Sequence, residues 1–267
     1  MSAQRPSQVV LRAFGAGRHV RRLPGGQGGS WLSGGFVFKR GRPADQSWMA
    51  DALGGLKSQV VRWAEPVLSI NGEWAVDGWT ATRLLKGSEP DLSQPSSWLG
   101  VVKAGRAFHQ AVVDVPRPSF LDAREDAWAL ADRLAWAEHS MPLLPEFTEL
   151  ARRFTAPRVT WGEPQLVHGD LTTNVLFAPG LPPAVIDISP YWRPPAYAEA
   201  VVAADALCWH GADASVLTLL ELSVGAVARA LLFRMATANA LALARTGAVD
   251  PRAEGVRFKR AADSLGL

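Results

Sequence analysis

The chain has 267 residues, of which 48% are hydrophobic and 20% charged, a balance typical of a globular protein and not of a disordered one. The net charge of +3 is too small to indicate nucleic-acid binding, and the single cysteine, Cys208, excludes an internal disulfide framework. Residues 1–8 are polar and contain no apolar signal segment. We therefore expect a cytoplasmic protein that is long enough to bury a sizeable core.

The first third of the chain has the pattern of a small β-sheet accompanied by helical segments. In chain order the pattern predicts a short helix, two strands separated by a glycine-rich turn, and a second helix, at residues 7–16, 20–23, 35–39 and 44–57. Two further strands are expected at residues 60–69 and 74–85. The dipeptide Asn71-Gly72 between them is typical of a hairpin turn.

From Pro95 onward the pattern becomes helical, with apolar residues recurring at spacings of three and four. The expected helices span residues 98–113, 120–139, 144–154, 198–209, 214–222, 225–246 and 252–264. The most apolar stretch, residues 224–244, is interrupted by Arg229 and Arg234. We therefore expect a helix that faces a protein core and does not span a membrane.

A polar loop between two apolar runs carries Asp170 and Asn174, and Asp187 ends the next apolar run. Phosphoryl transfer needs one carboxylate that orients the attacking hydroxyl and accepts its proton. It also needs oxygen ligands, such as a carboxylate and an amide, that hold Mg²⁺. The turn-forming residues 179–183 predict a hairpin that would return Asp187 beside Asn174. We therefore predict Asp170 as the catalytic residue and Asn174 and Asp187 as the metal ligands.

The pattern His168-Gly169-Asp170-Leu171-x-x-x-Asn174, followed by Ile186-Asp187, resembles the catalytic and metal loops of the aminoglycoside phosphotransferase family, the choline-kinase-like branch of the protein-kinase-like fold. The run from Pro24 to Gly28 also resembles an actinobacterial subgroup of that family, which implies no substrate. The resemblance implies an α+β, protein-kinase-like two-lobe fold. Residues 1–83 would form the nucleotide-binding lobe, a small antiparallel β-sheet with one helix. Residues 84–267 would form a mostly α-helical lobe that carries the catalytic and metal loops.

The glycine-rich turn is a candidate loop over the nucleotide phosphates, because glycines let backbone N–H groups approach phosphate oxygens closely. Its candidate nucleotide-binding residues are Gly26, Gln27, Gly28, Gly29 and Ser30. The alternative is an ordinary hairpin. No Gly-Lys-Ser/Thr sequence follows, so the segment is not a P-loop.

Lys39, at the end of the second predicted strand, is expected to contact the nucleotide phosphates, the alternative being a solvated lysine at a strand end. The following helix offers Asp45 and Asp51 as carboxylates that could orient it, and we choose Asp51. The family more often has Glu there, and Asp has a shorter reach. The resemblance places the adenine-binding backbone in one short segment, near Trp79, Thr80, Ala81 and Thr82.

Several other residues are assigned by the resemblance. His168 would be a scaffold histidine whose ring bonds to the backbone around the metal loop, with a catalytic role as the alternative. Asp205 would be the helix aspartate that braces the catalytic loop, and a buried aspartate there would need partners. His109 would be structural.

Residues 189–195 follow the metal aspartate, where the family lines the cleft for its acceptor substrate. Tyr191 and Trp192 could stack on a sugar or another apolar ring, and Arg193 could hold an anionic group. The alternative is a rigid, proline-rich surface loop. The segment departs from the Asp-Trp-Glu pattern usual in the family, so aminoglycoside specificity is not carried over.

The resemblance implies an ATP- and Mg²⁺-dependent phosphotransferase that moves the γ-phosphate to a hydroxyl of a small molecule, such as a sugar, an aminoglycoside-like compound or another metabolite. The alternative is a nucleotide-binding pseudokinase without turnover. A protein kinase is disfavoured, because Gly169 stands where His-Arg-Asp has arginine and Asp187-Ile188-Ser189 replaces Asp-Phe-Gly. We expect neither a nucleic-acid nor a membrane partner.

Overall fold

The computed structural model describes residues 5–24 and 29–267, and the chain divides into two compact units. Unit 1 comprises Met1–Pro90, Gln110–Pro118 and Thr173–Ile188, and unit 2 comprises Asp91–His109, Ser119–Thr172 and Ser189–Leu267. Residues 173–188 therefore cluster with the N-terminal segment, whereas the resemblance implies a second lobe of residues 84–267 that includes them. The division separates Asp170, in unit 2, from Asn174 and Asp187, in unit 1.

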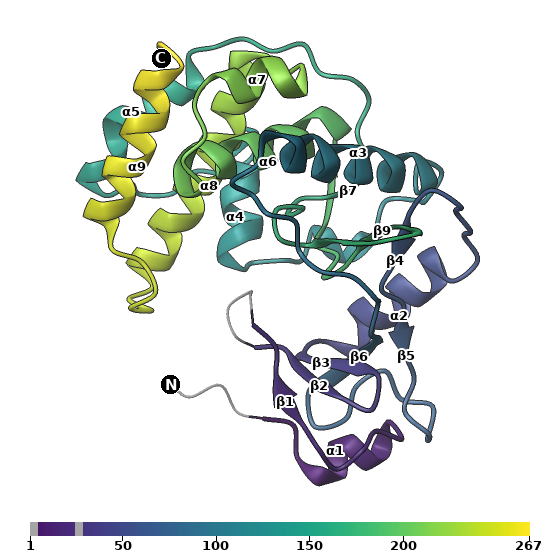
Figure 1. Cartoon of the computed structure of the whole chain (residues 1–267). Coiled ribbons are helices and arrows are strands. Elements are labelled where there is room, and N and C mark those ends of the chain that lie inside the picture. The colour runs from purple at the N-terminus through teal and green to yellow at the C-terminus, as the bar shows by residue number, and fades with distance from the viewer. Residues whose placement is uncertain (1–4, 25–28) are drawn as a thin grey trace. The chain divides into compact units, whose positions relative to one another are not determined.

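Unit 1 contains an antiparallel sheet with the strand order β1-β2-β3-β6-β5 (Figure 1). Its strands are β1 (Arg21–Arg22), β2 (Trp31–Ser33), β3 (Phe36–Arg40), β5 (Pro66–Val67) and β6 (Trp79–Arg83). Helix α2 (Pro43–Leu53) follows β3. Helix α1 (Gln8–Ala13) begins after Ser7, whose hydroxyl accepts from the Val10 backbone N–H as an N-cap. It packs on the sheet through an edge contact of Phe14 with Phe38 at 5.6 Å.

A second sheet in unit 1 contains the predicted hairpin, with β8 (Val175–Ala178) antiparallel to β9 (Leu181–Val185). Gly180 supplies the left-handed turn residue, with φ of +71°. Strand β4 (Arg62–Trp63) pairs in parallel with β9. The strand predicted at residues 60–69 is thus two short strands in different sheets, β4 and β5. Pro66, which has no backbone N–H, opens the second of them.

Unit 2 is mostly helical. Its helices are α3 (Pro95–Ala111, whose last two residues belong to unit 1), α4 (Ala127–Ala135), α5 (Pro145–Thr155), α6 (Pro195–Trp209), α7 (Ser215–Leu220), α8 (Val224–Leu243) and α9 (Pro251–Ser264). The single helix predicted at residues 120–139 is instead a 3₁₀ turn (Ser119–Leu121) and α4. The break occurs because Asp126 caps α4, its carboxylate accepting from the Ala129 N–H at 3.0 Å.

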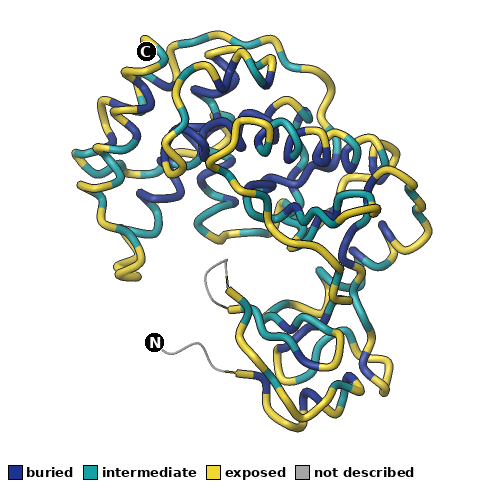
Figure 2. The backbone as a smooth tube through the Cα atoms, viewed as in Figure 1, coloured by how far each residue is buried: buried dark blue, intermediate teal, exposed yellow. Residues whose placement is uncertain are grey.

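Helices α6 and α8 form the centre of unit 2, and most of their length is buried (Figure 2). Within the described part of the chain, α8 alone is long and apolar enough to cross a membrane by length and composition. However, 67% of its most apolar stretch is buried inside the protein, packed against α4, α5, α6 and α9. Such burial is the pattern of a helix in a protein core.

Unit 2 also contains strands β7 (Gln165–His168) and β10 (Pro190–Arg193), which pair antiparallel. Residues 189–195 are therefore not the surface loop considered from the sequence. The prolines at 190, 194 and 195 allow a strand here, because they stand at its first residue and beyond its end. This pairing places the segment before α6 directly beside the strand that leads to Asp170.

Candidate active site

Two histidines hold the backbone of the loop that carries Asp170. The His168 N–H donates to Nε2 of His109 at 3.1 Å, and the Asp170 N–H donates to Nδ1 of His168 at 3.1 Å. The Gly169 N–H donates to the Ser189 carbonyl at 3.0 Å. The ring of His168 therefore bonds to the loop backbone, which is the geometry expected of a scaffold histidine.

Gly169 is required by packing against β10. A Cβ at this position would lie 2.4 Å from Cδ2 of the Tyr191 ring, closer than real contacts allow. Tyr191 is buried, with its ring 5.9 Å from that of Phe233. The absence of the arginine found in protein kinases at residue 169 thus has a local steric cause.

His109 is neutral in the folded protein. Burial, and secondarily the nearby His168, lower the pKa of His109 from about 6.5 to about 3. Because Nε2 accepts a hydrogen bond, the single ring proton of the neutral form is on Nδ1.

This depressed pKa makes stability depend on pH. Between about pH 6.5 and pH 3 the unfolded chain binds a proton at His109 that the folded chain excludes, so stability falls as pH falls through this window. We expect the free energy of unfolding to drop by about 2 kcal/mol more in the wild type than in His109→Gln between pH 7 and pH 5. The Gln amide oxygen can still accept from His168, and urea unfolding at both pH values measures the difference. Equal losses in the two proteins would contradict the assignment.

The Asp170 carboxylate is bonded to a residue that the sequence analysis did not assign to the site. Nη2 of Arg234, on α8, donates to Asp170 Oδ1 at 2.6 Å. The same guanidinium binds Asp205 on α6 through Nε at 2.8 Å and Nη2 at 2.7 Å. Burial raises the pKa of Asp205, and the charge of Arg234 opposes that rise. Asp205 thus lies where a brace for the catalytic loop would lie, with Arg234 as the connecting residue.

The predicted metal residues lie together at one end of the β8–β9 hairpin in unit 1. The Ile186 N–H donates to the Asn174 carbonyl at 2.9 Å, and Asp187 follows with φ of +49°, an uncommon left-handed conformation for a residue with a side chain. Lys39 of β3 forms an ion pair with Asp187. The structure therefore brings Lys39, Asn174 and Asp187 together within unit 1.

These residues fit a magnesium ion held jointly with a phosphate ligand. No group of three or more His, Cys, Asp or Glu side chains that could hold a metal occurs among the described residues. Mg²⁺ prefers oxygen ligands and is commonly held by one or two carboxylates together with substrate phosphates and water. The Asp187 carboxylate and the Asn174 amide oxygen, both on partly exposed side chains, are donors of this kind.

The carboxylate that pairs with Lys39 differs from the one expected. Asp51 is exposed on α2 and makes no ion pair with Lys39 in the described part of the chain. Asp45, the other candidate, pairs with Arg42 at 2.9 Å. Lys39 pairs instead with Asp187, in the hairpin that follows the Asp170 loop.

The residues expected near adenine belong to the interior of a sheet. Strand β6 lies between β3 and β5, with Thr82 opposite Val37 on one side and Pro66 on the other. Trp79 and Thr80 are buried and pair with β3. Their backbone groups therefore belong to the sheet, and we place no adenine contact on Trp79, Thr80 or Thr82.

The glycine-rich segment lies between β1 and β2, and β2 is a strand that the sequence analysis did not predict before the one expected at residues 35–39. Gly26, Gln27 and Gly28 lie outside the described residues. Gly29 is exposed, and the Ser30 carbonyl accepts from the Leu23 N–H at 2.9 Å, extending the pairing of β1 with β2.

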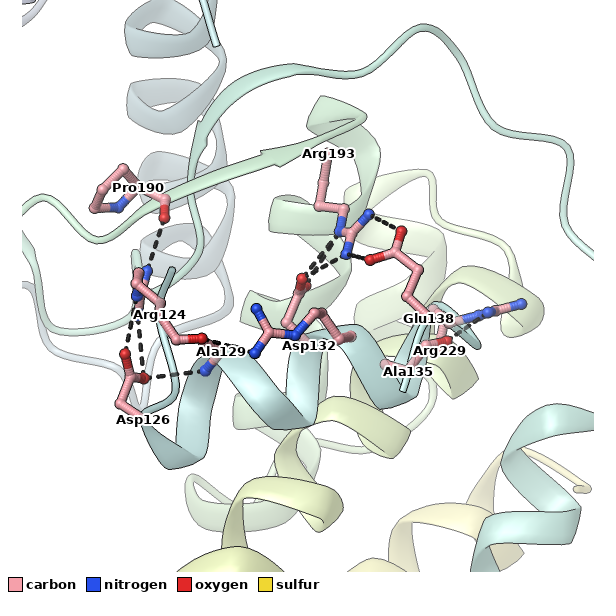
Figure 3. A network of polar contacts seen from close by, with 10 residues as sticks. Arg124, Asp126, Ala129, Asp132, Ala135, Glu138, Pro190, Arg193 and Arg229 are labelled. Atoms are coloured by element: carbon pink, nitrogen blue, oxygen red, sulfur yellow. Dashed lines mark hydrogen bonds and ion pairs between the residues drawn. The ribbon is translucent and has the colours of Figure 1, made fainter. Parts of the chain in front are cut away.

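Arg193 and Tyr191 have internal partners in place of the acceptor contacts expected from the sequence. Arg193 donates to Asp132 at 2.7 and 3.0 Å and to Glu138 at 2.7 Å (Figure 3). Its guanidinium also lies 4.8 Å from the centre of the Trp136 ring. The Nε–Nη2 side of the guanidinium thus binds Asp132, and the Nη1–Nη2 side binds Glu138. Trp192, the third predicted acceptor residue, is half-buried on β10.

Arg124 supports the start of β10 in the same network. Its guanidinium binds Asp126 and donates to the Pro190 carbonyl at 3.1 Å (Figure 3). It also lies 5.1 Å from the centre of the Tyr191 ring. Two arginines therefore connect β10 to α4 and to the segments on either side of α4. Arg193 does so through its carboxylate partners, and Arg124 through the Pro190 carbonyl.

No family model and no curated protein sequence matches the chain. Solved structures do match it over nearly its whole length. An aminoglycoside phosphotransferase from Alicyclobacillus acidocaldarius matches with a TM-score of 0.59 and 16% identity, covering 100% of this chain and 95% of its own. A spectinomycin phosphotransferase solved with ADP and spectinomycin matches with a TM-score of 0.57 and 11% identity, over 97% and 96% of the two chains. The fold is that of the aminoglycoside phosphotransferases.

A choline/ethanolamine kinase family protein from Mesorhizobium loti has the same fold, with a TM-score of 0.56 and 14% identity over 93% of this chain and 88% of its own. The α+β, protein-kinase-like fold implied by the His168–Asn174 motif is therefore confirmed. At these identities the likeness establishes the fold, and activity has to be argued from this chain's own residues.

Proposed function

We propose that the chain is an ATP-dependent phosphotransferase that moves the γ-phosphate to a hydroxyl of a small molecule in the cytoplasm. The observation that carries the proposal is the β8–β9 hairpin. It joins the backbone at Asn174 to Ile186 and sets Asp187 against Lys39. An oxygen-rich pair of metal ligands with a phosphate-binding lysine beside it suits a Mg²⁺-nucleotide. The shared fold of phosphotransferases supports the same reading.

In the proposed reaction the oxygen of the acceptor hydroxyl attacks the γ-phosphorus, and the bond from that phosphorus to the bridging oxygen breaks, releasing ADP. Asp170 orients the hydroxyl and takes its proton late in the step. Lys39, with the backbone of the segment that includes Gly29 and Ser30, contacts the phosphates. Bound Mg²⁺ would neutralise phosphate charge, with Asn174 and Asp187 as its protein ligands.

A small-molecule acceptor is favoured over a protein. Gly169 cannot be exchanged for the arginine with which protein kinases bind an activation-loop phosphate, because Tyr191 occupies the space. Aminoglycosides are not singled out, because the segment after Asp187 departs from the Asp-Trp-Glu pattern usual in the family. Arg193 is bonded to Asp132 and Glu138, so it is not proposed to hold an anionic acceptor group, and half-buried Trp192 is the candidate for stacking on a ring.

The test is ADP formation from Mg²⁺-ATP with a panel of hydroxyl compounds, including sugars, amino alcohols and aminoglycosides. We expect ADP formation that needs both Mg²⁺ and one class of acceptor, together with a phosphorylated product seen by mass spectrometry. Nucleotide binding without acceptor-dependent turnover across the panel would favour the pseudokinase alternative.

A further inference from the structure

We propose that Arg234 is a positioning residue for phosphoryl transfer, holding the Asp170 carboxylate in its working orientation while Asp205 compensates the charge of the arginine. This inference rests on the proposed function. It assigns a role to a residue on α8, 64 positions beyond Asp170, that no part of the loop motif contains.

The geometry of Arg234 is that of a fixed bridge. Its side chain is only 12% exposed, against 44% for Asp170 and 7% for Asp205. One edge of the guanidinium binds both oxygens of Asp205, and Nη2 reaches on to Asp170. The guanidinium is planar and rigid, so three bonds to two carboxylates fix the direction in which the Asp170 carboxylate is held.

The charges of the three residues explain why two carboxylates are needed. Arginine stays protonated in proteins, so Arg234 always carries a positive charge. Alone against Asp170 it would neutralise the carboxylate that has to attract and receive the acceptor proton. Asp205 binds the cation through two hydrogen bonds from the buried side, which leaves the three residues with one net negative charge. Arg234 can thereby orient the Asp170 carboxylate without cancelling its negative charge.

The position of Arg234 supports a functional reason for its presence. It lies between Phe233 and Met235, both buried, on a helix that is otherwise apolar along this stretch. Buried ion pairs are often no more stable than well-packed hydrophobic residues of similar volume. Packing therefore gives no reason for a cation at residue 234, whereas its bond to the predicted catalytic residue does.

The experiment compares Arg234→Met, Arg234→Lys and the double variant Arg234→Met/Asp205→Asn with wild type, using Mg²⁺-ATP and the acceptor found with the panel. Hydrolysis by water serves as the reaction if no acceptor is found. The double variant removes both buried charges, so the fold does not depend on an unpaired Asp205. Arg229→Met is the matched control, because Arg229 is also on α8 but donates to the Ala135 carbonyl (Figure 3).

We expect kcat to fall about 10²-fold in Arg234→Met and in the double variant, with KM for Mg²⁺-ATP unchanged, because misplacement of a reacting group by about 1 Å costs that much. Arg234→Lys, which keeps the charge without the fork, should recover part of the loss, and Arg229→Met should match wild type. A folded double variant with wild-type kcat would overturn the positioning role of Arg234 and leave the proposed function intact. Wild-type turnover that Asp170→Asn does not reduce would overturn the assignment of Asp170, and this inference with it, whereas wild-type protein without turnover of any kind would overturn the proposed function.

Discussion

Asp170→Asn lowers the rate of phosphoryl transfer by about 10²–10⁴-fold while leaving the affinity for Mg²⁺-ATP nearly unchanged. The range is the usual contribution of a positioned general base. The amide oxygen of Asn can still accept from Nη2 of Arg234, so the loop keeps its support, but the amide cannot take the acceptor proton. Lys39, Asn174 and Asp187, the proposed nucleotide and metal residues, are not altered.

Steady-state kinetics and nucleotide titration on the same preparations measure both quantities. Asp170→Glu is a useful companion, because it keeps the carboxylate and displaces it by one methylene; it should retain more activity than Asp170→Asn. Full activity in Asp170→Asn would contradict the assignment of the catalytic residue.

Asp132→Ala destabilises the protein by about 3 kcal/mol, near the lower end of the range for breaking a buried ion pair. Its carboxylate lies within unit 2 and binds Arg193 (Figure 3). The Arg193 side chain is itself largely buried, over the Trp136 ring. Removing Asp132 leaves the Arg193 cation with Glu138 only, and Glu138 is the more exposed partner. The loss should therefore fall short of the full cost of an unpaired buried charge.

Thermal unfolding tests this expectation against Glu149→Ala, which breaks an ion pair with Arg152 whose side chains are 71% and 74% exposed. Exposed pairs contribute about 0–1 kcal/mol, so the control should unfold within a few degrees of wild type. Asp132→Ala should unfold about 6–12 °C lower, at about 2–4 °C per kcal/mol. Equal effects in the two variants would show that the Arg193 network does not stabilise unit 2.

The parts of the fold that could be predicted from sequence are those with a local cause. The β8–β9 hairpin follows from two apolar runs around a proline- and glycine-rich turn, and α8 follows from apolar residues that continue for five turns. The motif from His168 to Asn174 placed the candidate site because its spacing is set within a single loop. Each of these signals is contained in the residues that it describes.

The parts that could not be predicted depend on contacts between distant segments. Arg234 appeared only as an interruption of an apolar stretch, and nothing near it in sequence indicates that Asp170 and Asp205 are its partners. An arginine inside an apolar helix was nonetheless a usable signal, because a buried cation requires a buried anion. Residues 189–195 were expected to line the acceptor cleft, with a proline-rich surface loop as the alternative, and the pairing with β7 that makes residues 190–193 a strand has no signal in the local sequence.

The adenine and lysine assignments rested on the resemblance alone. Trp79, Thr80 and Thr82 were placed by analogy with a family hinge, but the strand that contains them extends to Arg83, inside a sheet. Asp51 was chosen as the carboxylate on the helix after the lysine strand, and Lys39 instead pairs with Asp187. A resemblance fixes the order of elements more reliably than the ends of strands or the reach of a side chain.

The central claim, that Asp187 and its neighbours bind a Mg²⁺-nucleotide, is tested most directly by thermal unfolding of wild type and Asp187→Ala with and without Mg²⁺-ATP. Ligand at about 100 times its dissociation constant should stabilise the folded wild type by roughly 2.7 kcal/mol. For a chain of this size that corresponds to a rise in Tm of several degrees, at about 2–4 °C per kcal/mol. The account predicts a Mg²⁺-dependent rise in wild type that Asp187→Ala loses. No rise with any nucleotide, or an equal rise in Asp187→Ala, would contradict it.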